Sequence, residues 1–171
     1  MERRKGLLLR CDRRPCRLRS LLRPNQIFAV SLPHSPLNAD CQRGVVDICA
    51  RHLLTPFGLR SLAPGEPGYQ GRYRGDLKQR DSAYHQGTVW AWLTGPFISA
   101  YLRVHNDPQA ACALLQPLLG HLEEAGLGTL DEVFNADPSH APEGCFAQAW
   151  SAAEVRQALA EIQAASQSRT G

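Results

Sequence analysis

Residues 80–97, RDSAYHQGTVWAWLTGPF, join a glycine-rich stretch to an aromatic, helix-like one. From residue 88 to 105 the apolar side chains recur at the spacing of one helix face, and Gly95-Pro96 predicts a kink or a local start in that helix. Residues 59–86 hold too many glycines and prolines for a long regular element, so they predict a long loop. Long ordered loops often carry binding residues, so this junction is the first place to look for a functional site.

Helical patterns recur on both sides of this junction. They predict helices at about residues 24–30, 38–53, 108–125 and 148–165. Asn38 or Asp40 can cap the second of these helices, and Asp107 can cap the third. The segment between the last two helices lacks a helical pattern, apart from a brief extended or turn segment around Glu132. With no internal repeat and no alternation of strands and helices, the expected fold class is all-α with long loops.

The 171 residues are 43% hydrophobic and 20% charged, a composition typical of a soluble globular domain. Residues 1–22 differ from the rest, because their arginines are dense and follow no periodic pattern. This segment is either a disordered basic arm or translation from a shifted reading frame. We favour the second, because no interleaved aromatics or helical stripe support nucleic-acid binding. The expected organisation is this segment, a globular part at 23–165 and a tail at 166–171.

Several classes of site and location are disfavoured. The apolar run at residues 7–9 is much shorter than the roughly 7–15 residues of a signal-peptide core, and no segment approaches the ~18 residues of a membrane span. We therefore expect a cytoplasmic chain without membrane partners. Six cysteines form no C-x-x-C pair, so we expect no metal site, no cofactor and no disulfide framework. Cys49 and Cys112, which fall in helical patterns, are interpreted as small core residues.

The junction at residues 80–97 combines side chains that suit a sugar ligand. Pyranose rings offer C–H faces that pack on aromatic rings such as Tyr84 and Trp90. Sugar hydroxyls need short planar donors and acceptors, which His85 and Gln86 supply. A packed loop with core tryptophans explains the same composition equally well, so both interpretations stay open.

Asp131-Glu132 is the candidate for carboxylate chemistry. Hydrolysis of a glycosidic bond needs two carboxyl groups, one acid and one base. Neighbours in an extended segment point to opposite sides, so Asp131 and Glu132 could not both face one sugar and the second carboxylate must come from elsewhere. Asp76 and Asp81 are internal candidates, although capping or ion pairing is the better interpretation of both. His85 is better interpreted as a hydrogen-bonding residue than as a general base.

Five ordered blocks carry a resemblance to one family. These are RPNQIFAVSLP, LLTPFGLRSLAP, RDSAYHQGTVWAWLTGPF, AGLGTLDEVFNADPSHAPEGC and AQAWSAAEV. Together they are similar to the C-terminal region of bacterial and archaeal glycogen debranching enzymes, from about Leu22 to Ile162. The resemblance implies a partial (α/α)6 barrel, C-terminal half only, with its pocket at one mouth. It also implies hydrolysis of α-1,6-linked glucose at branch points of glycogen or limit dextrin, with inversion.

The resemblance assigns roles by block. Glu132 matches the general base that activates water. The residues that match the pocket wall and the sugar contacts are Arg23, Asn25, Gln26, Tyr84, His85, Gln86, Trp90, Gln148 and Trp150. The family's general-acid aspartate lies upstream of the block that begins at Arg23, and residues 1–22 contain nothing similar to it. Asp12 does not match.

The resemblance leaves three functions open. The chain can act with an upstream half of the barrel that another polypeptide supplies, since a twelve-helix barrel needs on the order of 250 residues or more. It can be an α-glucan-binding fragment without catalysis. It can also be a non-functional remnant that lacks the general acid. The expected partners are thus glycogen or limit dextrin and, under the first of these functions, that upstream half, with no nucleic acid.

Overall fold

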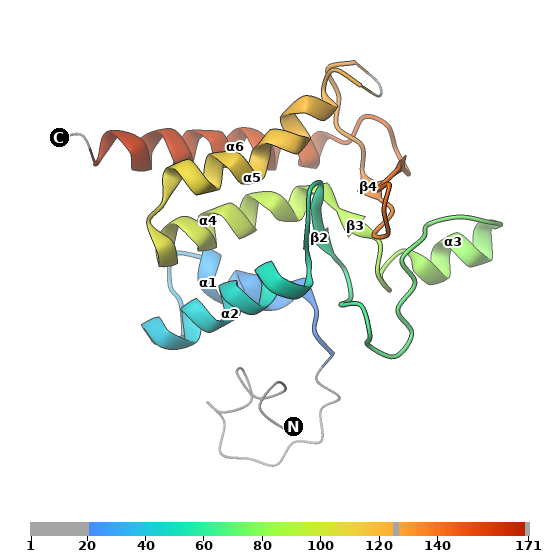
Figure 1. The fold of residues 1–171 in the computed structure, drawn as a ribbon, viewed down its shortest axis with the longest axis horizontal. Helices are drawn as coiled ribbons and strands as arrows, with labels where there is room; N and C mark the ends of the chain where they lie inside the picture. Colours follow the sequence, from blue (N-terminus) through green and yellow to red (C-terminus); the bar gives the residue numbers. More distant parts are fainter. Residues whose placement is uncertain (1–20, 125–126, 170–171) are drawn as a thin grey trace, which may run out of the picture.

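The computed structural model describes residues 21–124 and 127–169 (Figure 1). Its α-helices are α1 Phe28–Ser31, α2 Ala39–His52, α3 Leu77–Ala83, α4 Thr94–His105, α5 Pro108–His121 and α6 Ala149–Gln167. Two 3-10 turns, η2 Pro24–Ile27 and η3 Ala91–Leu93, lead into α1 and α4. The short strands are β1 Leu54–Thr55, β2 Gly58–Arg60, β3 Val89–Trp90, β4 Val133–Phe134 and β5 Pro142–Glu143.

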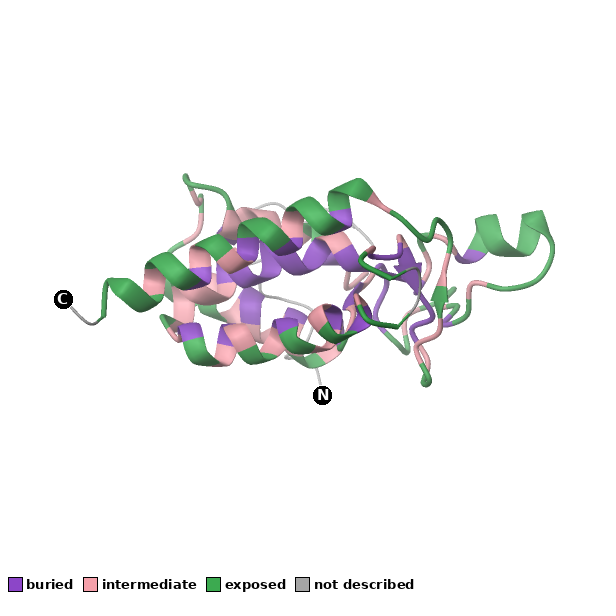
Figure 2. Cartoon of the chain, turned by 90° about the horizontal axis from the view of Figure 1, so that it is seen from above, coloured by how far each residue is buried: buried purple, intermediate pink, exposed green. Residues whose placement is uncertain are grey.

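Helix α4 is the centre of the helical part. In Figure 1, α5 and α6 lie on one side of it and α1 and α2 on the other, and α4 packs against all four. Two neighbouring side chains of α4 are buried on its opposite sides. Phe97 packs in a cluster with Val46 of α2, and Ile98 packs in a cluster with Leu115 of α5. A helix that is apolar on several faces is stable only when other elements cover it. Figure 2 agrees, since the buried surface faces inward while α6 turns an exposed face to solvent.

The five strands form one antiparallel sheet in chain order, which corrects the all-α expectation. Leu59 pairs with Trp90, and Trp90 pairs with Val133. The two faces of the sheet join different core clusters, because Trp90 packs with Leu59 and Val133 whereas Val89 packs with Phe134. Strands of two or three residues are too short to show alternation in the sequence, so the helical pattern concealed them. The fold is mostly helical with a small sheet.

The segment expected as one helix from 88 to 105 is divided into β3, η3 and α4. The alternative of a local start is confirmed, since α4 begins at Thr94 and Pro96 lies in its first turn. Gly95 lies where α4 meets α6, and a Cβ there would come within 2.8 Å of the Glu154 Cβ atom. Close helix packing therefore explains the glycine that the sequence showed as a breaker.

The expected loop at 59–86 contains β2 and the short helix α3. Asp76 starts α3 with a capping box, in which its carboxylate accepts a hydrogen bond from the Gln79 backbone N–H while the Gln79 side chain bonds back to the Asp76 N–H. This confirms capping as the role of Asp76. Figure 1 shows α3 projecting from the body of the molecule, and Figure 2 colours most of this helix as exposed. Asp81 is exposed on the same helix.

The remaining helices follow the sequence expectation closely. Asn38 caps α2, and Asp107 caps α5 by accepting from the Ala110 N–H at 3.0 Å. Helix α5 ends at His121, before the expected 125, and α6 continues through Gln167 into the expected tail. The basic segment was expected at residues 1–22, and its residues 1–20 lie outside the described residues.

Two of the cysteines expected in the core differ in how far they are buried. Cys49 is buried, and burial raises the pKa of its thiol to about 12, so it behaves as a neutral core side chain. Cys112 is half-buried. Within residues 21–124 and 127–169, no helix is both long and apolar enough to cross a bilayer.

Asn38→Ala is expected to destabilise the chain by about 1 kcal/mol. The Asn38 side chain accepts a hydrogen bond of 2.9 Å from the Cys41 N–H, and alanine leaves that first-turn donor without its cap. Urea denaturation of the purified chain measures the change. Asn38→Asp keeps an acceptor at the same place and should restore most of the loss, so equal losses in both variants would contradict a capping role.

Candidate functional site

Glu132 directly precedes the strand β4, and its side chain meets the loop before β3 at Tyr84 and the segment after β5 at Cys145. Asp131 and Glu132 point apart, as expected for neighbours in an extended segment. The Asp131 Oδ2 atom lies 2.6 Å from the Nε2 atom of His121 in the interior, and both residues are almost fully buried. The Glu132 side chain turns the other way and is only half-buried. One carboxyl group therefore anchors the segment while the other reaches toward the loop before β3.

Two donors hold the Glu132 carboxylate, one on each oxygen. The Tyr84 hydroxyl donates to Oε1 at 2.5 Å, and the backbone N–H of Cys145 donates to Oε2 at 3.2 Å. The Glu132 N–H donates in turn to the Cys145 carbonyl at 2.8 Å. Gly144, with φ of 75°, makes room for this arrangement, because a Cβ there would come within 2.7 Å of Oε2. Hydrogen bonds thus fix both oxygens of the carboxylate.

Tyr84 is itself held by its neighbours. Its carbonyl oxygen accepts a hydrogen bond from the Trp90 indole N–H at 3.1 Å, and its ring packs edge-on against the Trp90 ring with centroids 4.7 Å apart. The centroid of the Tyr73 ring lies 5.5 Å from the centroid of the Tyr84 ring. Burial raises the pKa of Tyr84 well above its ordinary value, and the hydrogen bond to Glu132 and the charge of that carboxylate raise it further. The phenol therefore stays protonated and donates.

A cavity of about 350 Å³ lies beside this cluster. Its lining residues are Arg23, Pro24, Asn25, Phe28, Ser61, His85, Trp90, Trp92, Leu93 and Trp150. Five of these ten residues carry aromatic rings, and Trp92 stacks on Phe28 with centroids 5.9 Å apart and on Trp150 with centroids 5.6 Å apart. The volume falls in the range of small-ligand pockets, roughly 300–1,000 Å³. An aromatic wall with polar side chains at its edge is suited to a sugar ring.

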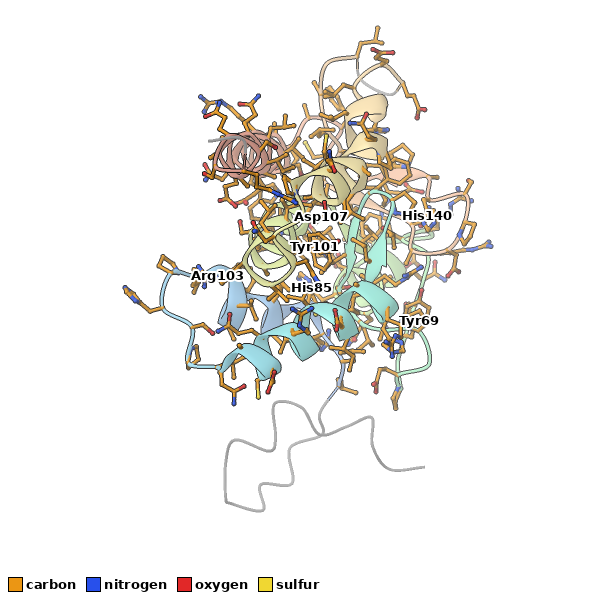
Figure 3. All side chains as sticks on the ribbon, turned by 60° about the vertical axis from the view of Figure 1, so that its left-hand side comes forward. Tyr69, His85, Tyr101, Arg103, Asp107 and His140 are labelled. Carbon is orange, nitrogen blue, oxygen red and sulfur yellow. The ribbon has the colours of Figure 1, made fainter. Side chains whose placement is uncertain are left out.

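His85 and Trp150 carry the exposed aromatic rings of this wall. The imidazole of His85 stacks on Trp90 with centroids 5.3 Å apart and planes 7° from parallel. Trp150, at the start of α6, is 46% exposed although its ring stacks on Trp92. Figure 3 labels His85 in the middle of its view, with Tyr69 and His140 on one side and Arg103 on the other. The rings of His85 and Trp150 are therefore available to a ligand.

Arg23 is used by the protein itself. Its guanidinium donates to the carbonyl oxygens of His85 at 2.6 Å and Ser61 at 3.1 Å, and to the Gln86 Oε1 atom at 2.8 Å. These bonds tie the first turn of the described chain to the loop before β3. Arg23 lines the cavity and Gln86 does not, but both side chains are engaged within the protein more than they present free hydrogen-bonding groups. Gln26 bonds back to the Arg23 carbonyl at 3.2 Å.

The expected site residues thus separate into two groups. Arg23, Asn25, His85, Trp90 and Trp150 line the cavity. Among the residues that the structure describes, those expected at the site but outside the cavity lining are Gln26, Tyr84, Gln86, Glu132 and Gln148. Tyr84 links the two groups, because it contacts both Glu132 and Trp90.

Sequence reasoning missed Phe28 and Trp92 as wall residues. Phe28 follows Asn25 by three positions, which places both on one face of the helical turn, and this spacing could have pointed to it. Trp92 belongs to the quoted aromatic stretch, but the helical pattern gave no reason to separate it from core positions. Only the stack with Trp150, from α6, distinguishes it.

The other carboxylates considered from the sequence, Asp76 and Asp81, do not line the cavity. Asp76 and Asp81 belong to the projecting α3, where Asp76 serves as its cap. Across 21–124 and 127–169, no three His, Cys, Asp or Glu side chains converge as a metal site would require. What the arrangement offers chemically is one oriented carboxylate next to an aromatic, sugar-sized cavity.

Comparison with known proteins adds the family. The family model described as Amylo-alpha-1,6-glucosidase matches residues 14–157, a range that begins inside the basic segment. The glycogen debranching enzyme of Saccharomyces cerevisiae is 27% identical over 155 residues, covering 77% of this chain and 10% of that protein. This similarity is distant, and the chain spans about a tenth of the length of the relative it matches.

Proposed function

Since the chain belongs to the amylo-alpha-1,6-glucosidase family, whose members contain part of an (α/α)6 toroid, we propose that it is the C-terminal part of a glucosidase domain. Its substrate would be the α-1,6-linked glucose at branch points of glycogen or limit dextrin. The observation that carries this proposal is the Glu132 carboxylate, held by two donors next to the aromatic cavity.

Glu132 acts in this proposal as the general base. An ionised carboxylate has about four acceptor positions, and the Tyr84 hydroxyl and the Cys145 N–H occupy one on each oxygen. The positions left on each oxygen can accept a hydrogen bond from the attacking water and then its proton. A second carboxyl group must protonate the leaving oxygen, from about 6.5–9.5 Å away in an inverting enzyme. We assign that acid to an upstream part of the toroid, because Asp131 is bound to His121 and Asp76 caps α3.

The stereochemistry of the product tests this mechanism. Direct displacement by water inverts the anomeric carbon, so glucose released from an α-1,6 branch should appear first as the β-anomer. Proton NMR during the first minutes of limit-dextrin hydrolysis, with the polypeptide that carries this chain, follows the two anomers. Initial release of the α-anomer would contradict a general-base role for Glu132 and indicate a covalent intermediate instead.

The source of the general acid can be found in the DNA. Translation of the sequence upstream of residue 1 in all three frames should show a continuation of the toroid that carries an aspartate. If another frame supplies it, the activity belongs to the joined polypeptide or to a complex of two chains. If none of the three frames continues the toroid, an upstream half encoded next to this chain is contradicted, and glycogen binding by the chain itself becomes the question to test.

Non-catalytic binding of α-glucan is the second candidate, because the cavity is lined by aromatic rings and those of His85 and Trp150 are exposed. Trp150→Ala should lower glycogen affinity about tenfold, since it removes an exposed ring of the wall and a contact worth about 1.4 kcal/mol is a factor of ten. Affinity electrophoresis in gels with and without glycogen measures the retardation.

Phe146→Ala is the matched control for this variant. Phe146 is more exposed than Trp150, at 66%, and lies four positions before it, but it is outside the cavity lining. Its removal should leave the retardation unchanged. Equal weakening in both variants would indicate general adhesion of exposed aromatic rings, and would count against the cavity as the glucan site.

A further inference from the structure

We propose that Tyr84 is a positioning residue for the Glu132 carboxylate and does not contact the sugar. This inference rests on the proposed function of Glu132, and it changes the role that the family resemblance gave Tyr84. The contact joins residues 48 positions apart, from the end of α3 to the segment before β4. It concerns the orientation of the base, which a general base needs before it can accept a proton from a bound water.

The direction of the hydroxyl supports this role. At 2.5 Å from Oε1 the Tyr84 oxygen makes a short, charge-assisted hydrogen bond, the strong class of such bonds. A phenol has one proton to give, and here it is given to Glu132. Tyr84 is also outside the cavity lining, whereas its neighbours His85 and Trp90 are in it.

The surroundings of Tyr84 fix the hydroxyl in place. The Trp90 indole donates to its carbonyl oxygen, the Trp90 ring packs against one edge, and Tyr73 and His85 contact the phenol ring. The same tryptophan therefore forms cavity wall on one side and supports Tyr84 on the other. A sugar that packs against Trp90 would meet a carboxylate whose orientation is already set.

Tyr84→Phe separates the hydroxyl from the ring. In the polypeptide that releases glucose, we expect kcat to fall by about 10- to 100-fold with KM within about twofold, because a hydrogen bond to a charged group is lost while the wall is kept. In this chain alone, glycogen retardation should stay at the wild-type value. Tyr73→Phe is the matched control. Its ring packs on Tyr84 with centroids 5.5 Å apart, while the two donors that hold the Glu132 carboxylate are Tyr84 and the Cys145 N–H.

The contact itself has a readout that needs no turnover. A hydroxyl proton in so short a bond to a carboxylate should give a downfield proton resonance in the NMR spectrum of this chain. The resonance should be lost in both Tyr84→Phe and Glu132→Ala and kept in Tyr73→Phe. Thermal melting of each variant identifies any loss of the resonance that comes from unfolding alone. A resonance that persists in folded Tyr84→Phe or folded Glu132→Ala overturns the contact.

The outcomes distinguish this inference from the function on which it rests. Full turnover by Glu132→Gln would remove the proposed base, whatever Tyr84 does. Loss of turnover in Glu132→Gln with unchanged kcat and KM in Tyr84→Phe would overturn the positioning role and leave the base in place. A raised KM or weaker glycogen retardation in Tyr84→Phe would make Tyr84 a sugar contact and would also overturn it.

Discussion

Glu132→Gln is expected to lower the rate of glucose release by about 100- to 10,000-fold, the usual effect of losing one general acid or base. The amide keeps the shape of the side chain, and its one carbonyl oxygen can accept a hydrogen bond from the Tyr84 hydroxyl or from the Cys145 N–H, but the amide cannot take a proton from water. Binding should therefore survive. Glucose release from limit dextrin and glycogen retardation on gels, measured on the same preparations, separate the two properties.

Glu123→Gln is a suitable control for this variant. Glu123 is exposed just beyond α5, and the same chemical change there should leave turnover and binding within experimental error. If Glu132→Gln retains wild-type turnover, Glu132 has no part in the mechanism. If it loses binding together with turnover, the carboxylate would have a role in holding the sugar as well.

Asp131→Ala is expected to destabilise the folded chain by about 3–5 kcal/mol. Its carboxylate and the His121 ring pair at 2.6 Å in the interior, and the Ser151 hydroxyl donates to the Asp131 carbonyl at 3.2 Å. The variant leaves a buried imidazole without its main partner, next to Phe57 and Phe134, whose rings pack around it. Urea denaturation followed by circular dichroism measures the loss.

The second carboxylate near His121 provides a control. Glu124 lies 3.7 Å from the other ring nitrogen, but its side chain is 73% exposed. An exposed pair contributes little to stability, so Glu124→Gln should change the free energy of unfolding by no more than about 0.5 kcal/mol. Similar losses in both variants would show that burial does not set the strength of this contact.

The sequence by itself determined most of the helical framework. Capping residues at Asn38 and Asp107, prolines at first turns and helical spacing placed α2, α5 and α6 close to their observed ends. These signals are local, because a cap and the N–H that it satisfies lie within three residues of each other. The ordered blocks also indicated the family, and the family model matches most of the chain.

Local reasoning also fixed one property of the site. Neighbours in an extended segment point apart, so the divergence of Asp131 and Glu132 needed no tertiary information. The sequence could not say which of the two would turn inward. The interior position of His121, at the end of α5, decided that.

Only the tertiary structure decided the sheet and the contacts that it brings together. Each strand has two or three residues, too few for a period, and is stabilised by partners far along the chain, as in the pairing of Trp90 with Val133. The hydrogen bond from Tyr84 to Glu132 and the stack of Trp92 on Trp150 arise in the same way. Composition showed that these residue types suit a sugar, but their roles depend on which side chain each one meets. That is set by packing between distant segments, which the spacing of residues along one segment does not encode.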